Sequence, residues 1–341
     1  MAPKRNVRIS TIWLAGAVQH CAHACSYCSI GDKAGGRLPL EHFLDFVMRF
    51  ARLLPRDGDK EVKVHPIVHY SYEYGAEGAR RMEPMRRAFG LPTLEQITTG
   101  GLRLRDEAQS RAWLRDWRDF GVRTIHATFA GMNETHDSYN GRRGDFDYLW
   151  MLQKVAAELG MELGQSLLLT KTTAPRILEL VEKLKTLNAP LDHRWVFPPA
   201  YMGHGKALEA DRIGESERDT LPRELCEMRS PHFATWRSER EWLKELATEQ
   251  TRQEEVFCNV RLDVSRIQAF ETKESSEITK SLIDRARRAY EAIPPLGELA
   301  REFGDRTNER IYLHRYEIER LLVDRFLISI PTSFERDLTE L

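Results

Sequence analysis

The sequence has no run of about 18 apolar residues, so it predicts no membrane-spanning helix. Its basic first residues are followed only by a short apolar stretch, 11–18, that leads directly into cysteines, so a signal peptide is not expected. Neither sign of charge dominates, because the net charge is −1. Charge therefore gives no reason to expect a nucleic-acid or membrane partner. The chain also contains no repeat at a fixed period and no low-complexity tract.

Cysteine is scarce, with five among 341 residues. An odd, small number in a chain of this length is not typical of a secreted disulfide framework, so we expect a reducing, cytoplasmic location. Hydrophobic residues make up 41% and charged residues 30% of the chain, a balance typical of folded rather than disordered proteins. At about 100–200 residues per domain, the length allows one large domain or two.

Strand-like and helix-like segments alternate through the first 200 residues. Apolar residues spaced by three and four predict helices, and short apolar runs that end at glycine or polar turns predict strands. The expected strands are 7–17, 62–70, 94–99, 122–129, 161–170 and 191–197, and the expected helices are 40–54, 76–89, 107–120, 147–159 and 175–187.

Six such alternations predict parallel βαβ units in an α/β fold, arranged as a partial barrel or an open doubly wound sheet. Periodicity does not choose between the two, but both place a working site at the C-terminal ends of the strands. The composition changes after Pro198-Pro199, which predicts a first domain of 1–200 and a mixed α+β C-terminal region of 201–341. Within that region the expected elements are helices at 235–254, 278–293 and 316–323 and a strand pair within 256–270.

Three of the cysteines, Cys21, Cys25 and Cys28, lie within eight residues, directly after the first expected strand. Thiolates are the usual ligands of iron–sulfur clusters. The C-x3-C-x2-C spacing lets one loop bind three corners of a cubane and leaves the fourth iron open to a small molecule. A structural zinc site is an alternative, but it needs a fourth ligand, and His20 and His23 lie so close to the cysteines that either would strain the loop. Inert buried thiols are the remaining alternative.

This loop, with the aromatic Tyr27 just before its last cysteine, resembles the signature loop of the radical SAM superfamily, over roughly residues 7–200. The resemblance implies a partial (β/α)6 TIM-like barrel and one [4Fe-4S] cluster held by Cys21, Cys25 and Cys28. The open iron would bind S-adenosylmethionine. An electron from an external donor such as flavodoxin or ferredoxin would split a C–S bond, and the resulting 5′-deoxyadenosyl radical would take hydrogen from a substrate.

The resemblance also suggests cofactor-binding residues, the first of which is Tyr27 of the cysteine loop. Glu73 and Gly75 stand where the family has a Gly-Gly-Glu-Pro-like turn, whose glutamate binds the methionine amino group; a solvated Glu73 is an equally good interpretation. Thr128 stands at a serine position on the fourth expected strand. Arg142 or Arg143 would replace the family's carboxylate-binding arginine.

Two polar residues on later strands complete this set. Gln165 on the fifth expected strand and Arg194 on the sixth are each flanked by apolar residues. Both are expected to face the barrel mouth and the ribose.

The stretch from Thr135-His136-Asp137 to Phe146 resembles the peptide-modifying, SPASM-type branch of the family. Only Cys226 and Cys258 remain beyond the triad, too few for a further cubane, so a single cluster is predicted. The resemblance implies a peptide or protein side chain as substrate. A small molecule such as a nucleoside, sugar or amino acid remains an alternative, as does a non-catalytic iron–sulfur or zinc protein.

Overall fold

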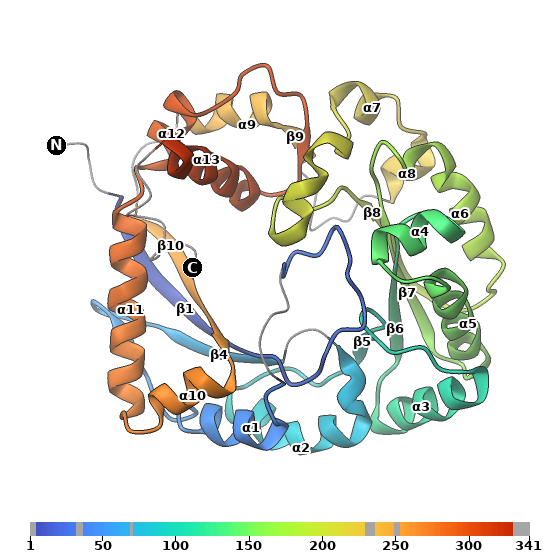
Figure 1. Ribbon diagram of the computed structural model, residues 1–341, viewed down its shortest axis with the longest axis horizontal. Helices are drawn as coiled ribbons and strands as arrows, with labels where there is room; N and C mark the ends of the chain where they lie inside the picture. Colours follow the sequence, from blue (N-terminus) through green and yellow to red (C-terminus); the bar gives the residue numbers. More distant parts are fainter. Residues whose placement is uncertain (1–4, 32–36, 69–70, 229–235, 249–252, 330–341) are drawn as a thin grey trace.

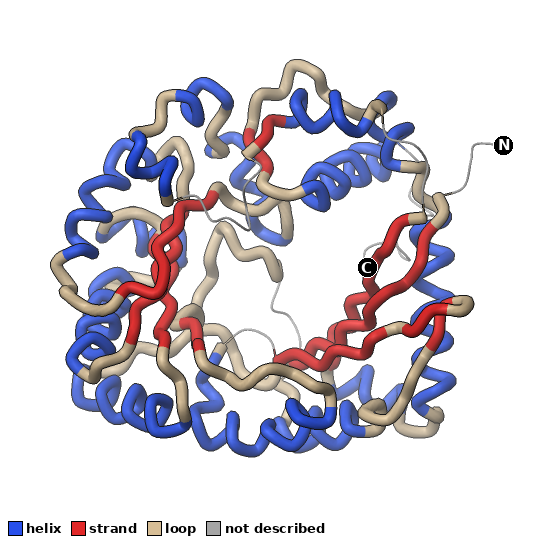
Figure 2. The backbone as a smooth tube through the Cα atoms, turned by 180° about the vertical axis from the view of Figure 1, so that it is seen from behind, coloured by secondary structure: helices blue, strands red, loops and turns tan. Residues whose placement is uncertain are grey.

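The computed structural model describes residues 5–31, 37–68, 71–228, 236–248 and 253–329. Two parallel sheets face each other across the centre of the molecule, and helices cover their outer sides (Figures 1 and 2). One sheet has the order β10-β1-β4 and the other β5-β6-β7-β8. These strands are β1 (Val7–Gly16), β4 (Lys63–Val68), β5 (Gln96–Thr98), β6 (Thr124–Phe129), β7 (Glu162–Leu168), β8 (Leu191–Phe197) and β10 (Glu254–Leu262).

The predicted α/β architecture of parallel strands is confirmed, because each of the six expected strands contains or coincides with one of β1 and β4 to β8. Within the described residues no strand ladder joins β4 to β5 or β8 to β10, so the arrangement is open and barrel-like. Two short antiparallel pairs lie outside the parallel sheets: β2 (Arg56–Asp57) with β3 (Lys60–Glu61), and β9 (Arg237–Ser238) with β11 (Ile311–Tyr312).

The helices follow the strands in alternation and are ended by local signals. In α3 (Glu107–Phe120), the Asp106 side chain accepts from Gln109 N, and Gly121 ends the helix in the left-handed conformation. The other helices are α1 (Leu40–Met48), α2 (Gly75–Ala88), α4 (Asn133–Asn140), α5 (Asp145–Glu158), α6 (Ile177–Lys185), α7 (Glu215–Asp219), α8 (Arg223–Glu227), α9 (Glu239–Leu246), α10 (Val264–Phe270), α11 (Ser275–Glu291), α12 (Leu296–Glu302) and α13 (Arg315–Ser329). The 3-10 segments are η1 (Tyr72–Tyr74), η2 (Ala174–Arg176) and η3 (Gly203–Asp211).

Packing against the helices distinguishes the outer face of the β5-β6-β7-β8 sheet from its inner face. On β6, Phe129 packs on Phe146 of α5, and Gln153 of α5 donates to the Ile125 carbonyl at 3.0 Å. Because side chains alternate along a strand, the positions between these, including His126 and Thr128, lie on the inner face.

The C-terminal region differs from the sequence-based expectation. Residues 254–270 form one strand, β10, followed by α10, and not a strand pair. β10 runs parallel to β1, from Val7 beside Glu254 to Gly16 beside Leu262. Its buried residues join the main core, so the region after residue 200 completes the first sheet as well as forming a second apolar cluster of its own. Sequence periodicity cannot show this, because it does not identify a pairing partner about 250 positions away.

Among the described residues, no helix has the length and apolar character needed to cross a membrane.

Gly16, where β1 ends, provides a test of this packing. A Cβ at Gly16 would lie 2.4 Å from Cδ2 of Phe43, a buried residue of α1. We expect Gly16→Ala to lower the free energy of unfolding by about 1–3 kcal/mol through overpacking. Gly100→Ala is the matched control, because a Cβ there meets nothing within 4 Å and should change stability by less than about 0.5 kcal/mol. Urea unfolding measures both, and equal effects would contradict the packing described here.

Candidate active site

The cysteine loop lies at the C-terminal end of β1, as predicted. Cys25 is buried, Cys21 and Cys28 are partly exposed, and none is in a disulfide. Alternate peptide N–H groups of this loop donate to carbonyls of other segments: Ala22 to Gly101 (2.9 Å), Ala24 to Asn140 (3.0 Å) and Ser26 to Tyr139 (2.8 Å). The loop is therefore held from two sides, by the turn after β5 and by the end of α4.

Two glycines allow this close packing. A Cβ at Gly101 would lie 2.5 Å from the Cys21 Sγ, and a Cβ at Gly203 would lie 2.5 Å from the Cys28 carbonyl oxygen. Both have positive φ, +75° and +53°, which favours glycine independently of space. The N–H of His204 donates to the same Cys28 carbonyl at 2.9 Å, so the start of η3 holds the end of the cysteine loop.

A buried carboxylate, Asp145, connects this loop to the barrel. Its side chain is fully buried and is bonded to Asn140 Nδ2 at 2.5 Å and His136 Nε2 at 3.1 Å. Arg142 Nε donates to it at 3.1 Å, and His23 Nε2 of the cysteine loop lies 3.3 Å away. Burial alone would raise the pKa of Asp145, but the hydrogen bonds from His136 and His23, together with the nearby positive charge, hold that pKa well below its ordinary value.

Asn140 and Tyr27 extend this network toward the last cysteine. The Tyr27 hydroxyl donates to Asn140 Oδ1 at 2.6 Å, while Asn140 Nδ2 bonds Asp145. Burial, followed by the charge of Cys25, raises the pKa of Tyr27, so this hydroxyl stays protonated. Tyr27 thus connects the cysteine loop to α4, while the cofactor contact expected of it stays a prediction.

The His136-Asp137 pair has an architectural role. His136 Nδ1 accepts from the Ala130 N–H at 2.9 Å, just beyond the end of β6. Asp137 accepts from the N–H groups of Gly144 and Phe146 at the start of α5. Both side chains are therefore occupied within the fold.

The structure gives Glu73 and Arg142 partners within the protein. Glu73 receives Arg105 in a bidentate pair, Nη1 to Oε1 at 2.8 Å and Nη2 to Oε2 at 2.6 Å, and also accepts from the Arg103 N–H. Arg142 binds Asp145 and the Leu102 carbonyl. A contact between either side chain and a cofactor would have to replace these bonds.

Gln165 and Arg194 lie on the outer face of the sheet, where the sequence-based expectation placed them at the barrel mouth. Gln165 Nε2 donates to Gln153 of α5 at 3.0 Å, and Arg194 Nε donates to Gln165 Oε1 at 2.7 Å. Their polarity thus serves the contact between sheet and helix. The expectation fails because polarity within an apolar strand does not indicate which face the side chain occupies.

Thr128 and Gly75 keep positions compatible with their predicted roles. Thr128 lies on the inner face, one residue before the end of β6, and is partly exposed. Gly75 begins α2 with φ +68°, and a Cβ there would meet nothing within 4 Å, so its backbone conformation accounts for the glycine.

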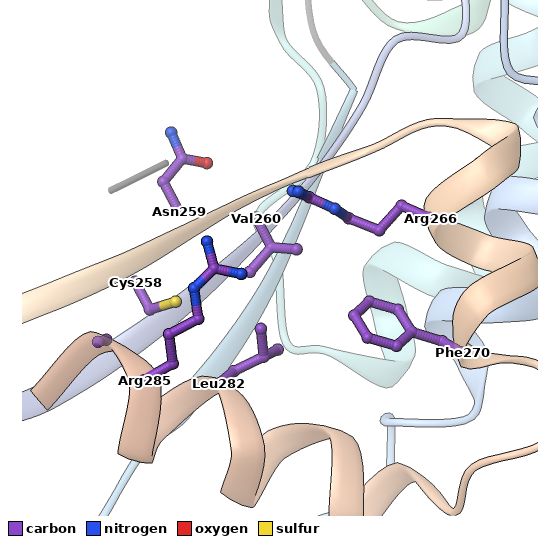
Figure 3. Close-up of a pocket in the computed structure, with 8 residues that line it drawn as sticks. Cys258, Asn259, Val260, Arg266, Phe270, Leu282 and Arg285 are labelled. Atoms are coloured by element: carbon purple, nitrogen blue, oxygen red, sulfur yellow. The ribbon is translucent and has the colours of Figure 1, made fainter. Parts of the chain in front are cut away.

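The two other cysteines lie far from the triad in sequence and on other elements, Cys226 on α8 and Cys258 on β10. Cys258 is buried and faces α11 beside Leu282 and Arg285, on the helix-covered side of its strand (Figure 3). Burial raises the pKa of this thiol to about 11, so it stays protonated at neutral pH.

The triad has the donor chemistry that an iron–sulfur cluster needs. All three side chains lie on one loop and are outside any disulfide, and the missing Cβ of Gly101 leaves space beside the Cys21 sulfur. Within the described residues, no group of three or more histidine, cysteine or acidic side chains is arranged around a point that could hold a single metal ion. The donor chemistry and spacing of the three thiols nevertheless fit the cluster that the resemblance implies.

Sequence reasoning missed Asp145 and His23 as the centre of the site. Asp145 stands between Gly144 and Phe146 in the stretch that resembles the family, but nothing in that pattern marks it as buried. A lone acidic residue flanked by helix signals is ordinarily solvated, and only the tertiary contacts of His23 and His136 indicate its role.

No protein-family model and no curated protein sequence matches the chain. Among solved structures, it is similar to coproporphyrinogen III oxidase (HemN) from Escherichia coli, described as a radical SAM enzyme, at 12% identity and a TM-score of 0.44, covering 96% of this chain and 91% of that one. Streptococcus suis SuiB bound to precursor peptide SuiA has 14% identity and a TM-score of 0.44, and the match covers 65% of this chain and 46% of that one. Methylornithine synthase (PylB) has 15% sequence identity and a TM-score of 0.34, and the match covers 60% of this chain and 56% of that one.

The HemN description names the superfamily that the cysteine loop resembles. The matched part of this chain spans less than half the length of SuiB. At such identities and TM-scores, the activity of this chain has to follow from its own residues.

Removing the charge of Asp145 tests the network. We expect Asp145→Asn to cost about 3 kcal/mol or more of unfolding free energy, because Arg142 and the surrounding hydrogen-bond donors lose their anionic partner. Asp147→Asn, an exposed residue in the same helical turn, is the control and should cost less than about 1 kcal/mol. Since the folded pKa of Asp145 is lowered, its contribution is complete above the unfolded value of about 3.9 and is lost as the pH falls below it. The difference in unfolding free energy between wild type and Asp145→Asn should therefore become smaller at acid pH. A difference that does not depend on pH would contradict this account.

Gly203→Ala tests the packing of η3 against the cysteine loop. Its Cβ would displace the Cys28 carbonyl, so we expect less iron bound per chain after anaerobic reconstitution while circular dichroism stays unchanged. Gly160→Ala is the control, because Gly160 also has positive φ, +74°, but open space around its Cβ position. Equal iron loading in the two variants would show that crowding at Cys28 has no effect.

Proposed function

We propose that this chain is a radical SAM enzyme. The carrying observation is a loop with three cysteines outside any disulfide, fixed at the C-terminal end of the strands by bonds to Gly101, Asn140 and Tyr139. In open and closed parallel α/β folds alike, that end is where working sites lie.

Cys21, Cys25 and Cys28 would hold one [4Fe-4S] cluster in this site. When bound, the cluster and S-adenosylmethionine supply a 5′-deoxyadenosyl radical, which removes hydrogen from a substrate. An external donor, such as flavodoxin or ferredoxin, would provide the electron. A cluster with three protein ligands leaves one iron for the cofactor, whereas structural zinc is closed by four ligands.

The protein's own residues fix the loop and present groups to the cofactor. Tyr27 of the loop is bonded through Asn140 to Asp145, which ties the loop to the barrel. The Thr128 hydroxyl, on the inner face near the end of β6, can donate to a cofactor there. Arg143 is exposed on the turn before α5, so it is a freer candidate than Arg142 for the methionine carboxylate.

We propose a peptide or protein side chain as the substrate. The support is the resemblance of residues 135–146 to the peptide-modifying branch, although His136 and Asp137 themselves serve the fold. A small molecule is the alternative, favoured by the lack of cysteines for auxiliary clusters. A gene for a small precursor peptide beside this one would support the first, and a sugar or nucleotide pathway the second.

The function is tested by cofactor cleavage. Anaerobically reconstituted protein, reduced with dithionite and given S-adenosylmethionine, should bind about four iron atoms per chain and form 5′-deoxyadenosine. Replacing Cys21, Cys25 and Cys28 together by alanine should abolish both, because no thiolate ligand remains on the loop. Cys226→Ala is the matched control and should keep both. Zinc in place of iron, or a loaded wild type without 5′-deoxyadenosine, would contradict the proposal.

A further inference from the structure

Four polar side chains form a continuous hydrogen-bonded row on the β5-β6-β7-β8 sheet. Ser166 Oγ lies 2.7 Å from His126 Nε2, and His126 Nδ1 lies 2.7 Å from His193 Nε2. His193 Nδ1 in turn lies 2.6 Å from Asp192 Oδ2. Ser166, His126 and His193 occupy the inner face, opposite Gln165 and Arg194, so they are not part of the contact with α5.

The two histidines meet because the strand between them carries a glycine. His126 on β6, Gly164 on β7 and His193 on β8 are aligned in register across the sheet. A Cβ at Gly164 would lie 2.6 Å from His126 Nδ1 and 3.0 Å from His193 Nε2. Glycine weakens a strand interior, and it often marks a place where another group approaches the backbone closely. Because Gly164 has no side chain, the His126 and His193 rings can contact each other across β7.

Exposure increases along the row. Ser166 and His126 are buried, at 5% and 6% exposure, whereas His193 is partly exposed and the Asp192 side chain is 40% exposed. Trp195 stacks on His193 with ring centroids 3.9 Å apart, which fixes the orientation of that ring. The row therefore connects an interior hydroxyl with water.

One arrangement of protons satisfies every bond in the row in one direction. The Ser166 hydroxyl donates to His126 Nε2, the His126 Nδ1–H donates to His193 Nε2, and the His193 Nδ1–H donates to ionised Asp192. We propose that this row is a proton path between the inside of the barrel and bulk water, with the Ser166 hydroxyl as its substrate-side end. Ser166 is paired in register with Thr128, so this end lies beside the proposed cofactor-binding hydroxyl.

The path balances without any oxidant. A substrate group X–H gives its proton to Ser166 Oγ, and the serine hydroxyl proton moves to His126 Nε2. The Nδ1 proton of His126 moves to His193 Nε2, and that of His193 moves to Asp192 and then to water. The substrate loses one proton, water gains one, and each imidazole exchanges one N–H for another. The reverse sequence delivers a proton to the substrate.

The electrostatics of His126 favour such a transfer. Burial, and then the neighbouring His193, lower the pKa of His126 to about 4, although Asp192 opposes the shift. His126 is therefore neutral at physiological pH, with one nitrogen able to accept and the other able to donate.

Histidine-selective ¹⁵N labelling of the apo protein tests the path without substrate. Long-range ¹H–¹⁵N spectra at neutral pH should show both rings protonated at Nδ1 and not at Nε2. Signals are assigned by their loss in His126→Gln and His193→Gln. The opposite tautomer of either ring would interrupt the row and overturn the proposal.

The rate of solvent exchange gives a second measurement. If the row were merely structural, this rate would not depend on Asp192. The buried His126 Nδ1–H should exchange with water through His193 and Asp192. Asp192→Asn, a surface change that should not unfold the chain, should slow this exchange by about ten-fold or more, because the terminal acceptor is lost. Asp116→Asn, exposed on α3, is the control and should leave it unchanged. Gly164→Ala should separate the rings and also slow exchange. An unchanged rate in Asp192→Asn would overturn the path.

The use of this path in catalysis rests on the proposed function, but its test does not. The spectra need neither cluster nor S-adenosylmethionine, whereas the proposed function is judged by 5′-deoxyadenosine from loaded wild type. Failure of one therefore leaves the other standing.

Discussion

The cysteine loop depends on one buried negative charge. Asp145, at the start of α5, bonds His136 and Asn140 of α4 and lies beside His23 of the loop, so three separate segments meet at one carboxylate. Burying a charge is costly unless partners compensate, which is why the surrounding donors are as important as the acid itself. Through Asn140 the same network holds the Tyr27 hydroxyl, next to the last cysteine. The cysteine loop is thus positioned by buried polar side chains of the barrel.

Features that depend on residues close together in the chain could be predicted from the sequence. Side-chain orientations and partners that depend on distant contacts could not. The hydrophobic periodicity predicted the strand positions, and the order of residues along the chain placed the cysteine loop at the end of β1. The sheet face on which Gln165 and Arg194 lie could not be predicted, because only the packing of α5 determines which face is the outer one. Glu73 was expected near a cofactor, but Arg105, 32 residues later, takes its carboxylate. The row through His126 and His193 has no local signature, since its members come from three strands.

The region after residue 200 contributes contacts that support the cysteine loop. Glu317 of α13 accepts from the Tyr201 N–H at 3.0 Å, just before the glycine that packs on the cysteine loop. Burial raises the pKa of Glu317 to about 7, while Arg212 nearby favours its charged form. Helix α13 and the cysteine loop are therefore connected through residues 201–204, a short segment that leads into η3. A change in α13 can reach the thiols by this route.

The pairing of β1 with β10 has a consequence for synthesis on the ribosome. The thiols emerge early, but the strand that flanks β1 ends only at Leu262. At about 5–20 residues per second, roughly 10–50 s separate the two events. During that interval the nascent chain carries three uncovered sulfurs on an unfinished sheet, open to oxidation or to stray metal. Assembly of the cluster proposed for this loop is therefore expected to follow the pairing of β10 with β1, and the thiols would have to stay reduced until then.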